Sequence, residues 1–409
     1  MQLFYKQISN NPYSPIKGTD LAAGFDLHSS IHTIVPSKGV KCINTDLEVI
    51  LPTGYYGRIA ARSGMCLKSY ITVIESIIEG KCENVNIILY NFGERDYKVQ
   101  RGDRIAQLIC EKYFYDCNKR KNDVPLFKNL SSEVIPSKKS SAIFYALCPV
   151  EIDIPSKSVV SIPINIQMNL PSNNYYGRIT SIPEMSINSH VIVLEDVITK
   201  EEEKENYKIT LYNFSNTNYK INKSDGIAQI ICEKIINPVL SELSINVEKE
   251  LMLENFYQLY FKKLSNVARA PTQSQLGFNL YSPRTETIPS DGVICINTNL
   301  QIILPNIDCY GRIASTRENI KNFTTVLGGV VDKDYKGDVG VILYNFGKTD
   351  RTIHEGDIIA RLICENICYP QLTKLISIKE TVNNMSIKKF RGTLGFGSSG
   401  GYNVVEKKK

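Results

Sequence analysis

The segment ARSG at residues 61–64 carries chemical groups that could grip a polyanion. Arg62 offers a guanidinium, Ser63 a hydroxyl, and Gly64 a backbone N–H that no side chain obstructs. Hydrogen bonds from such donors to phosphate oxygens are charge-assisted and geometrically specific. The alternative interpretation is an exposed basic turn, so the segment becomes informative only when other groups join it.

Two further segments supply carboxylates. Asp26 lies in AAGFDL (22–27), and Asp332 lies in GGVVDKDYKGD (328–338). An aspartate at a strand end is usually a turn residue, and a DxDY sequence is by itself consistent with a simple hairpin turn. No histidine is well placed to compete with these carboxylates as a general base.

A glutamine and a glycine-rich tail complete the set of chemical segments. Gln107, in RGDRIAQL (101–108), could donate an amide N–H to an anion. Gln229 stands at the equivalent position of a related segment, which also favours a structural role for Gln107. The tail KKFRGTLGFGSSG (388–400) joins basic, aromatic and small polar residues, although Gly/Ser-rich ends are also often flexible tags.

The elements that must position these groups come in three tandem copies. The returning segments are YYGRIAARSG (55–64), YYGRITSIPE (175–184) and CYGRIASTRE (309–318), then ILYNFG (88–93), TLYNFS (210–215) and ILYNFG (342–347), then IAQLICEK (105–112), IAQIICEK (227–234) and IARLICEN (359–366). The step from the Asn of LYNF to the Cys of ICE is 19 residues in every copy. Self-similarity in one order and one spacing indicates three copies of one folding unit.

Each copy is predicted to be all-β. Residues 85–90 and 43–47 alternate or run apolar over strand lengths, and turn residues such as those at 36–39 separate the strands. Short strands at this spacing are typical of a β-sandwich or jelly roll.

Two polar stretches are interpreted as linkers. They cover residues 113–140 and 236–270, and the second includes a possible short helix over Val247–Leu264. The expected units are therefore residues 1–118, 119–240 and 241–386, followed by a C-terminal arm at 387–409.

Comparing the copies separates two kinds of residue. Residues that every copy keeps, such as the LYNF segment and three equivalent arginines, are predicted to be structural. The three arginines are Arg58, Arg178 and Arg312. Residues that one copy alone keeps are candidates for chemistry, as Asp26 is, because copy two has Tyr145 and copy three has Asn279 in its place.

In order, the five chemical segments resemble the five motifs of the trimeric, all-β dUTPase family, whose members cleave dUTP to dUMP and pyrophosphate with Mg²⁺. The shared scaffold covers nearly the whole chain three times, whereas each motif is intact only once, apart from partial copies of the fourth. A lone RSG or a lone glycine-rich tail would be weak evidence, but five motifs in family-like spacing are specific.

The resemblance implies a role for each residue in the first four motifs. Arg62, Ser63, Gly64 and Gln107 would bind phosphate oxygens, and Asp26 would hold Mg²⁺ through water, since Mg²⁺ keeps several of its waters. Asp332 would orient and deprotonate the water that attacks the α-phosphorus. Two further parts would recognise the nucleoside: Tyr335 lies under the deoxyribose, and the backbone of Gly329, Val330 and Val331 reads the uracil edge.

The resemblance also makes the tail a closing arm. Phe396 would stack on uracil, Arg391 would meet a phosphate, and the segment Gly397, Ser398 and Ser399 would wrap the γ-phosphate. Family members usually have Thr at the place of Ser399, which is a mild departure. Closure of such an arm would exclude water and gate turnover.

The distribution of motifs implies one composite site. In the family, one subunit supplies the first, second and fourth motifs, a neighbour supplies the third, and the fifth is a mobile arm. Here copy one keeps the first, second and fourth motifs, and copy three keeps the third and fifth. We therefore expect an intramolecular pseudo-trimer that works as a monomer with one site.

The origin of the arm is unusual, because strict threefold symmetry would take the third and fifth motifs from different copies. The stretch from Cys368 to Arg391 could span roughly 70 Å when extended, so that reach is not limiting. Either the arm follows a new path or two chains exchange arms. Two other functions stay open: a nucleotide-binding or protein-interaction scaffold without catalysis, and, more weakly, a dCTP deaminase.

Composition limits the classes of protein to which the chain can belong. A chain of 409 residues with 43% hydrophobic content can bury two or three cores. No signal peptide or membrane span is expected, and the eleven cysteines show no CxxC pair, so we expect reduced thiols and an intracellular, cytoplasmic or nuclear protein. The net charge of +6 supports only a weak preference for anionic ligands, with no nucleic acid or membrane partner.

Overall fold

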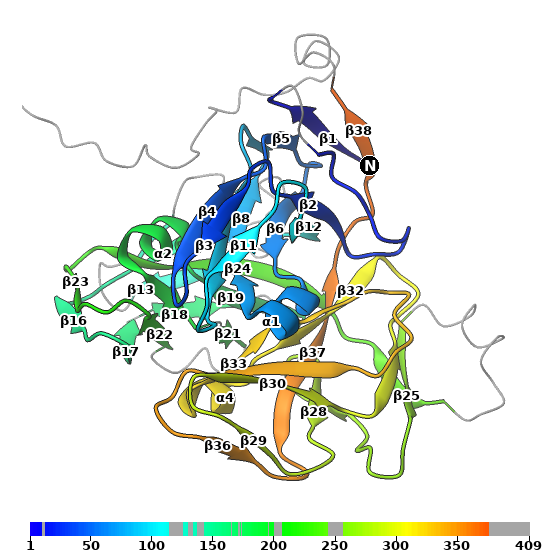
Figure 1. Ribbon diagram of the computed structural model, residues 1–409. Helices are drawn as coiled ribbons and strands as arrows, with labels where there is room; N and C mark the ends of the chain where they lie inside the picture. The colour runs from blue at the N-terminus through cyan, green and yellow to red at the C-terminus, as the bar shows by residue number, and fades with distance from the viewer. Residues whose placement is uncertain are drawn as a thin grey trace, which may run out of the picture.

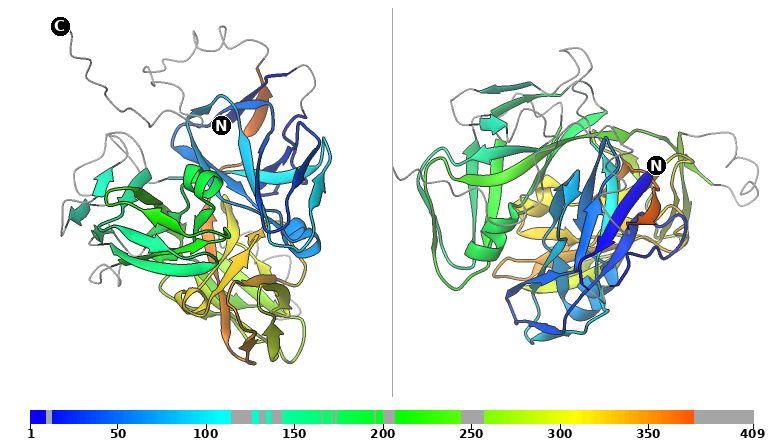
Figure 2. Two further views of the ribbon diagram at one scale, coloured as in Figure 1. Left: turned by 60° about the vertical axis from the view of Figure 1, so that its left-hand side comes forward. Right: turned by 90° about the horizontal axis from the view of Figure 1, so that it is seen from above.

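Three β units surround one axis in the computed structural model. Figure 1 shows copy one in blue and cyan, copy two in green, and copy three in yellow and orange, and Figure 2 shows the same arrangement from two further sides. The structure describes residues 1–9, 13–113, 126–129, 134–136, 143–164, 166–170, 172, 174–194, 196–199, 207–243 and 257–375.

The elements follow one order in every copy. Copy one contains β1 (Gln2–Gln7), β2 (Gly24–His28), β3 (Thr33–Val35), β4 (Val40–Asn44), β5 (Leu47–Ile50), β6 (Tyr55–Ala60), α1 (Ser63–Ser69), β7 (Ile71–Val73), β8 (Ser76–Glu79), β9 (Lys81–Cys82), β10 (Asn86–Asn91), β11 (Tyr97–Val99) and β12 (Arg104–Lys112). Copy two contains β13 (Leu126–Asn129), β14 (Val134–Pro136), β15 (Ile143–Leu147), β16 (Ile152–Ile154), β17 (Ser158–Ile164), β18 (Ile166–Asn169), β19 (Tyr175–Thr180), α2 (Pro183–Ser189), β20 (Val191–Val193), β21 (Asp196–Ile198), β22 (Tyr207–Asn213), β23 (Tyr219–Ile221), β24 (Gly226–Ile236) and β25 (Val239–Glu242). Copy three contains β26 (Gln258–Lys263), β27 (Thr272–Gln273), β28 (Phe278–Tyr281), β29 (Glu286–Ile288), β30 (Gly292–Asn297), β31 (Leu300–Ile303), β32 (Cys309–Ala314), α4 (Arg317–Lys321), β33 (Thr324–Leu327), β34 (Val330–Val331), β35 (Gly340–Asn345), β36 (Arg351–Ile353), β37 (Ile358–Asn366) and β38 (Gln371–Lys374).

Two sheets recur in each copy and enclose its core. Copy one has a sheet in the order β2-β12-β6-β8 and another in the order β4-β10-β7. Copy two repeats them as β15-β24-β19-β21 and β17-β22-β20, and copy three as β28-β37-β32-β34 and β30-β35-β33. The central strand of the first sheet is buried along nearly its whole length, which explains why the IAQLICE segment runs apolar instead of alternating. The all-β pseudo-trimer predicted from the sequence is confirmed.

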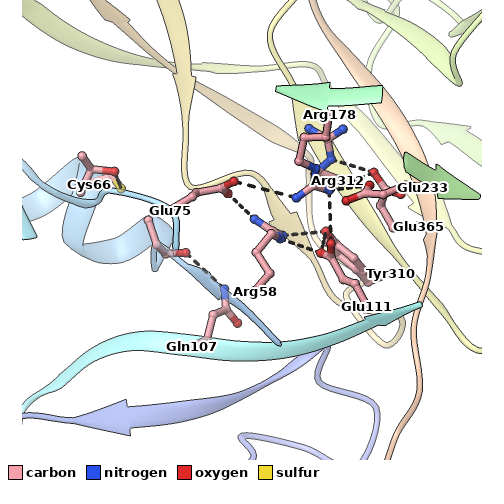
Figure 3. A network of polar contacts seen from close by, with 12 residues as sticks. Arg58, Cys66, Glu75, Gln107, Glu111, Arg178, Glu233, Tyr310, Arg312 and Glu365 are labelled. Carbon is pink, nitrogen blue, oxygen red and sulfur yellow. Dashed lines mark hydrogen bonds and ion pairs between the residues drawn. The ribbon is translucent and has the colours of Figure 1, made fainter. Parts of the chain in front are cut away.

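Conserved charged and aromatic residues of the three copies converge on the axis (Figure 3). The network contains Arg58, Arg178 and Arg312; Glu111, Glu233 and Glu365; and Tyr56, Tyr176 and Tyr310. Arg178 is fully buried, and its Nη2 lies 3.1–3.3 Å from one carboxylate of every copy. Arg58 Nη2 donates to the Tyr310 hydroxyl of copy three at 2.6 Å. These contacts confirm the structural role predicted for the three arginines.

Strand pairing closes the copies into a ring. The residue two places after the glutamate in each central strand pairs with the glutamate of the next copy: Tyr113 with Glu233, Ile235 with Glu365, and Ile367 with Glu111. A second set of pairs lies at the periphery. β25, at the end of copy two, runs parallel to β26 of copy three, and β38 runs parallel to β1 of copy one.

The short helix expected over Val247–Leu264 is wrong in its described part. Residues 258–263 form β26, which pairs with β25 on one side and with β31 on the other. Two neighbouring strands satisfy its backbone and bury Leu259 and Phe261, and this tertiary pairing overrides any local helical preference. None of the helices in the described part of the chain is long and apolar enough to cross a membrane.

Candidate active site

The AAGFDL segment of copy one meets the DKDY hairpin of copy three. At the start of β2, Ala23 N–H donates to Oδ1 of Asp332 at 2.7 Å. Gly328, at the start of the same hairpin, packs against the ARSG loop, where an added Cβ would lie 3.2 Å from the Cα of Ser63. Segments about three hundred residues apart thus border one junction, as the composite site requires.

Two glycines shape the hairpin. Gly328 and Gly329 have φ angles of 72° and 73°, in the left-handed region that favours glycine. A Cβ on Gly329 would lie 2.4 Å from the carbonyl oxygen of Ile313, so a side chain cannot be accommodated there.

Val330 and Val331 then pair with β32 only, which makes β34 an edge strand within the described part of the sheet. Its outer N–H and C=O groups can therefore hydrogen-bond a ligand.

Two arginines hold Asp26. Arg62 Nε lies 3.0 Å from Oδ1 of Asp26, and Arg104 Nη1 donates to Oδ2 at 3.2 Å. Sequence reasoning missed Arg104, although its equivalents are Gly226 in copy two and Ile358 in copy three. The criterion of a residue kept in one copy alone could have identified it.

The ARSG loop leads directly into α1. Gln107 Nε2, in β12, donates to the carbonyl of Ala61 at 3.2 Å, and this hydrogen bond holds the loop against the strand. Arg62 occupies the N-cap position of α1, and among the described residues no side chain caps this helix. Gly64 lies open, because an added Cβ would meet nothing within 4 Å. The first turn of α1 thus presents uncapped N–H groups beside two guanidinium groups.

Tyr335 stands at the tip of the hairpin with 43% of its surface exposed. Its N–H donates to the carbonyl of Asp332 at 3.1 Å, and its hydroxyl donates to the carbonyl of Asp338 at 2.8 Å. The carboxylate of Asp338 accepts the N–H of Leu300 at 3.1 Å. Asp338, which sequence reasoning passed over, therefore anchors the hairpin and the hydroxyl of Tyr335.

Several neighbours set the charge state of Asp332. Burial raises the pKa of its carboxyl above the ordinary value, and the nearby Asp334 and Asp26 raise the pKa further. The hydrogen bond from Ala23 and the positive charge of Lys17 act in the opposite direction. A carboxylate with a raised pKa binds a proton more strongly, which suits a general base. Lys17 was also missed by sequence reasoning, because it lies outside the repeated segments.

The acidic groups fit a metal ion that a polyphosphate ligand would carry. The described residues contain no group of three or more His, Cys, Asp and Glu side chains that could hold an ion. Asp26 and Asp332 are close enough for their charges to interact. Mg²⁺ typically binds through one or two carboxylates, several waters and substrate phosphates. The donor set suits that mode and does not form a dedicated protein cage.

The fifth motif lies outside the described residues, together with its predicted site residues Arg391, Phe396, Gly397, Ser398 and Ser399. The chain before it is described as far as Leu375. β38 runs along β1, and Leu375 N–H donates to the carbonyl of Tyr5 at 2.8 Å. The described part of copy three therefore ends on copy one, which contributes the other half of the site.

The dUTPase family model matches residues 13–134, 131–256 and 265–400. The deoxyuridine 5'-triphosphate nucleotidohydrolase of Rattus norvegicus is 41% identical over 161 residues, which cover 38% of this chain and 74% of that protein. The corresponding protein of Mus musculus is 38% identical over 161 residues, which cover 38% of this chain and 94% of its own. That of Avian adenovirus 8 is 42% identical over 114 residues, which cover 28% and 70%.

Among solved structures, the Staphylococcus bacteriophage 80alpha dUTPase has 24% identity and a TM-score of 0.28, and the match covers 29% of this chain and 95% of that one. A mutant dUTPase of phage phi11 of S. aureus, described with a structural Mg(II) ion, has 21% identity and a TM-score of 0.27, and the match covers 29% of this chain and 96% of that one. The three successive matches to the family model span most of the sequence, and each covers one of the structural copies. The chain belongs to the dUTPase family, in a form that carries the family's domain three times in tandem.

Proposed function

We propose that the chain hydrolyses dUTP to dUMP and pyrophosphate with Mg²⁺, at a single site between copies one and three. The observation that carries this proposal is the hydrogen bond from Ala23 to Asp332, which joins the first and third motifs across the copies. Relatives from mammals and an adenovirus that bear the name deoxyuridine 5'-triphosphate nucleotidohydrolase support the same activity.

The triphosphate binds at the first turn of α1. Arg62, Ser63 and Gly64 donate from a guanidinium, a hydroxyl and a backbone N–H, and Gln107 adds its amide when it turns from the Ala61 carbonyl. The carboxylate of Asp26 balances the charge of Arg62. Phosphate oxygens can replace that carboxylate as the partner of Arg62, since charge-assisted bonds to phosphate are strong and geometrically well matched.

Asp332 acts as the general base. Its carboxylate accepts a proton from the water that attacks the α-phosphorus, and pyrophosphate leaves. The N–H of Ala23 fixes one carboxylate oxygen, so that the other is free to face the water. The raised pKa strengthens Asp332 as a proton acceptor.

The hairpin of copy three selects uracil and deoxyribose. The outer edge of β34, with Gly329, Val330 and Val331, pairs with the base edge by main-chain hydrogen bonds. A tight hairpin at this place leaves no room for the thymine methyl group. The exposed ring of Tyr335 packs under the sugar and excludes a 2′-hydroxyl.

Asp26 would hold the metal ion through water, after Arg62 has turned to the phosphates. Mg²⁺ bound there would neutralise charge on the phosphate oxygens. The arm would complete the site. Phe396 would stack on the base, Arg391 would bind a phosphate, and Gly397, Ser398 and Ser399 would surround the γ-phosphate.

One chain suffices for this site, and we propose that the protein acts as a monomer. Specific activity should then be constant on dilution, whereas an exchange of arms between chains would make it fall.

The described cysteines are free thiols, which suits the reducing cytoplasm or nucleus.

A pyrophosphate-release assay tests the proposal, with dUTP beside dCTP and dTTP, and with the full chain beside a chain that ends at residue 386. We expect release from dUTP alone, and a large loss without the arm. No release above background from the full chain would reject the enzymatic function. If dUTP binds in that case, the chain is a nucleotide-binding scaffold, and ammonia release from dCTP would identify a deaminase.

A further inference from the structure

Two cysteines face each other at the interface that the backbone does not bridge. Copies one and two are consecutive in the chain, as are copies two and three, whereas copies three and one meet only in space. There, Glu111 pairs with Ile367 in an antiparallel bridge, and Cys368 N–H donates to the carbonyl of Cys110 at 3.0 Å. This register places Cys110 directly opposite Cys368.

The geometry of the pair suits a disulfide bond. Directly opposite residues of an antiparallel pair have Cα atoms about 4.5–5.5 Å apart, and disulfides span Cα distances of about 4.4–6.8 Å. The two side chains lie close enough to affect each other's pKa, which is raised for Cys110 and lowered for Cys368. A bond between them requires rotation of the side chains and no movement of the strands.

The equivalent position at the neighbouring interface provides an internal control. Cys364 of copy three occupies the place of Cys110, and Ile236 of copy two lies opposite it in the same register. The central-strand cysteine thus faces a second cysteine at the junction of copies three and one, and an isoleucine at the junction of copies two and three.

The surroundings distinguish the two thiols. The hydrogen bond from Cys110 lowers the pKa of the Cys368 thiol, and the positive charge of Lys17 acts in the same direction. The ammonium group of Lys17 lies 4.4 Å from the ring centre of Tyr369 and 5.1 Å from that of Phe25. Cys368 is thus the better nucleophile of the pair.

We propose that Cys110 and Cys368 form a reversible redox modification site, which covalently closes copy three onto copy one. Hydrogen peroxide is the oxidant: the Cys368 thiolate attacks one peroxide oxygen, and a sulfenic acid forms while hydroxide leaves. The Cys110 sulfur then displaces the hydroxyl group, and the S–S bond forms. The two thiols lose two protons and two electrons in all, and the peroxide is reduced to two waters. A dithiol reductant reverses the reaction.

Peptide mapping of the full chain tests this proposal. Wild-type protein is treated with peroxide or with dithiothreitol, the remaining thiols are alkylated, and the digest is analysed by mass spectrometry. We expect a peptide pair linked through Cys110 and Cys368 after peroxide, two fewer alkylated thiols, and a rise of several degrees in Tm that dithiothreitol reverses. Cys364→Ala should keep the linked pair, and Cys368→Ser should lose it.

The mapping of the wild type decides the question even where a variant folds poorly. Oxidation of the half-buried Cys42, Cys82 or Cys295 while Cys110 and Cys368 stay alkylatable would overturn the proposal. Cross-links from Cys110 or Cys368 to other cysteines, or their direct conversion to sulfonic acids, would overturn it too. Because the readouts are a covalent link and a melting temperature, their outcome does not depend on dUTP hydrolysis.

Discussion

The interface between copies three and one differs chemically from the interface between copies two and three, although the two share one backbone arrangement. At the first, Asp332 follows β34 and accepts a hydrogen bond from Ala23. At the second, Thr199 holds the corresponding place after β21, and its hydroxyl donates to Gln275 at 3.1 Å. Residue 199 of copy two still contacts copy three, but a neutral hydroxyl replaces the carboxylate.

The first turns of α1 and α4 differ in the same sense. Thr316 stands where copy one has Arg62, and its Oγ1 accepts the N–H of Asn319 at 3.1 Å as a regular N-cap. Glu318 stands where copy one has Gly64, and its negative charge interacts favourably with the positive end of the helix dipole. In copy three these positions stabilise the helix, and in copy one they leave donors open for an anion. The comparison shows that a few local changes alter the chemical groups at these positions while the scaffold stays intact.

The largest effect is expected from Asp332→Asn. Removal of a general base lowers rates by about 10²–10⁴-fold, so kcat should fall by that factor while dUTP still binds. Steady-state pyrophosphate release and calorimetric titration with a non-hydrolysable dUTP analogue would measure the two quantities. Thr199→Val, at the equivalent place in the other interface, is the matched control and should keep full activity. Undiminished turnover by Asp332→Asn would refute the assigned role.

Arg178→Ala tests the scaffold that the two interfaces share. Truncation leaves buried carboxylates of all three copies without their common partner, and breaking a buried ion pair costs about 3–5 kcal/mol. Urea denaturation would measure the loss in the free energy of unfolding. Lys220→Ala, which removes an exposed ion pair with Glu151, should leave stability unchanged. Equal stability of both variants would mean that the axial network does not hold the copies together.

Gly64→Glu gives copy one the acidic residue that copies two and three have at this position, as Glu184 and Glu318. Repulsion between the new carboxylate and the phosphates should weaken the charged hydrogen bond from the N–H of residue 64, worth about 1.5–3 kcal/mol, and lower kcat/KM by about 10–100-fold. The backbone tolerates a side chain at this open position, so Tm should hardly change. Gly64→Ala, which adds bulk without charge, is the control for space. A kcat/KM equal to that of the wild type would remove Gly64 from the phosphate site.

The smallest effect concerns pH. The raised pKa of Asp332 places the acid limb of kcat/KM above the ordinary aspartate range, because the protonated carboxyl cannot accept a proton from water. Activity should therefore fall as the pH drops through this raised pKa. Asp334→Asn removes a negative neighbour that raises the pKa, and should move the limb to lower pH. A pH–rate profile at constant ionic strength measures the shift, and a movement to higher pH would contradict this electrostatic assignment.

The internal repeats allowed the fold to be predicted, and they identified the candidate residues of the proposed site. The equivalence of Asp26, Tyr145 and Asn279, inferred from alignment of the copies, agrees with the strand register, since they lie opposite Gln107, Gln229 and Arg361. The same comparison could have revealed Arg104. It could not reveal Lys17 or the Cys368 contact, because these depend on how copy three closes onto copy one. Segment 258–263 was predicted to be helical, but it is a strand because it pairs with β25 and β31, neither of which is adjacent to it in the sequence.

The parallel pairing of β1 and β38 also determines how the molecule would resist mechanical load. Gln2 lies opposite Gln371, and Tyr5 lies opposite Lys374, so a force that pulls the start of β1 away from the end of β38 acts along both strands. Their hydrogen bonds would then be loaded in shear and break together, not one after another. We therefore expect this peripheral strand pair to resist tension along the chain more strongly than a pair whose hydrogen bonds open one after another.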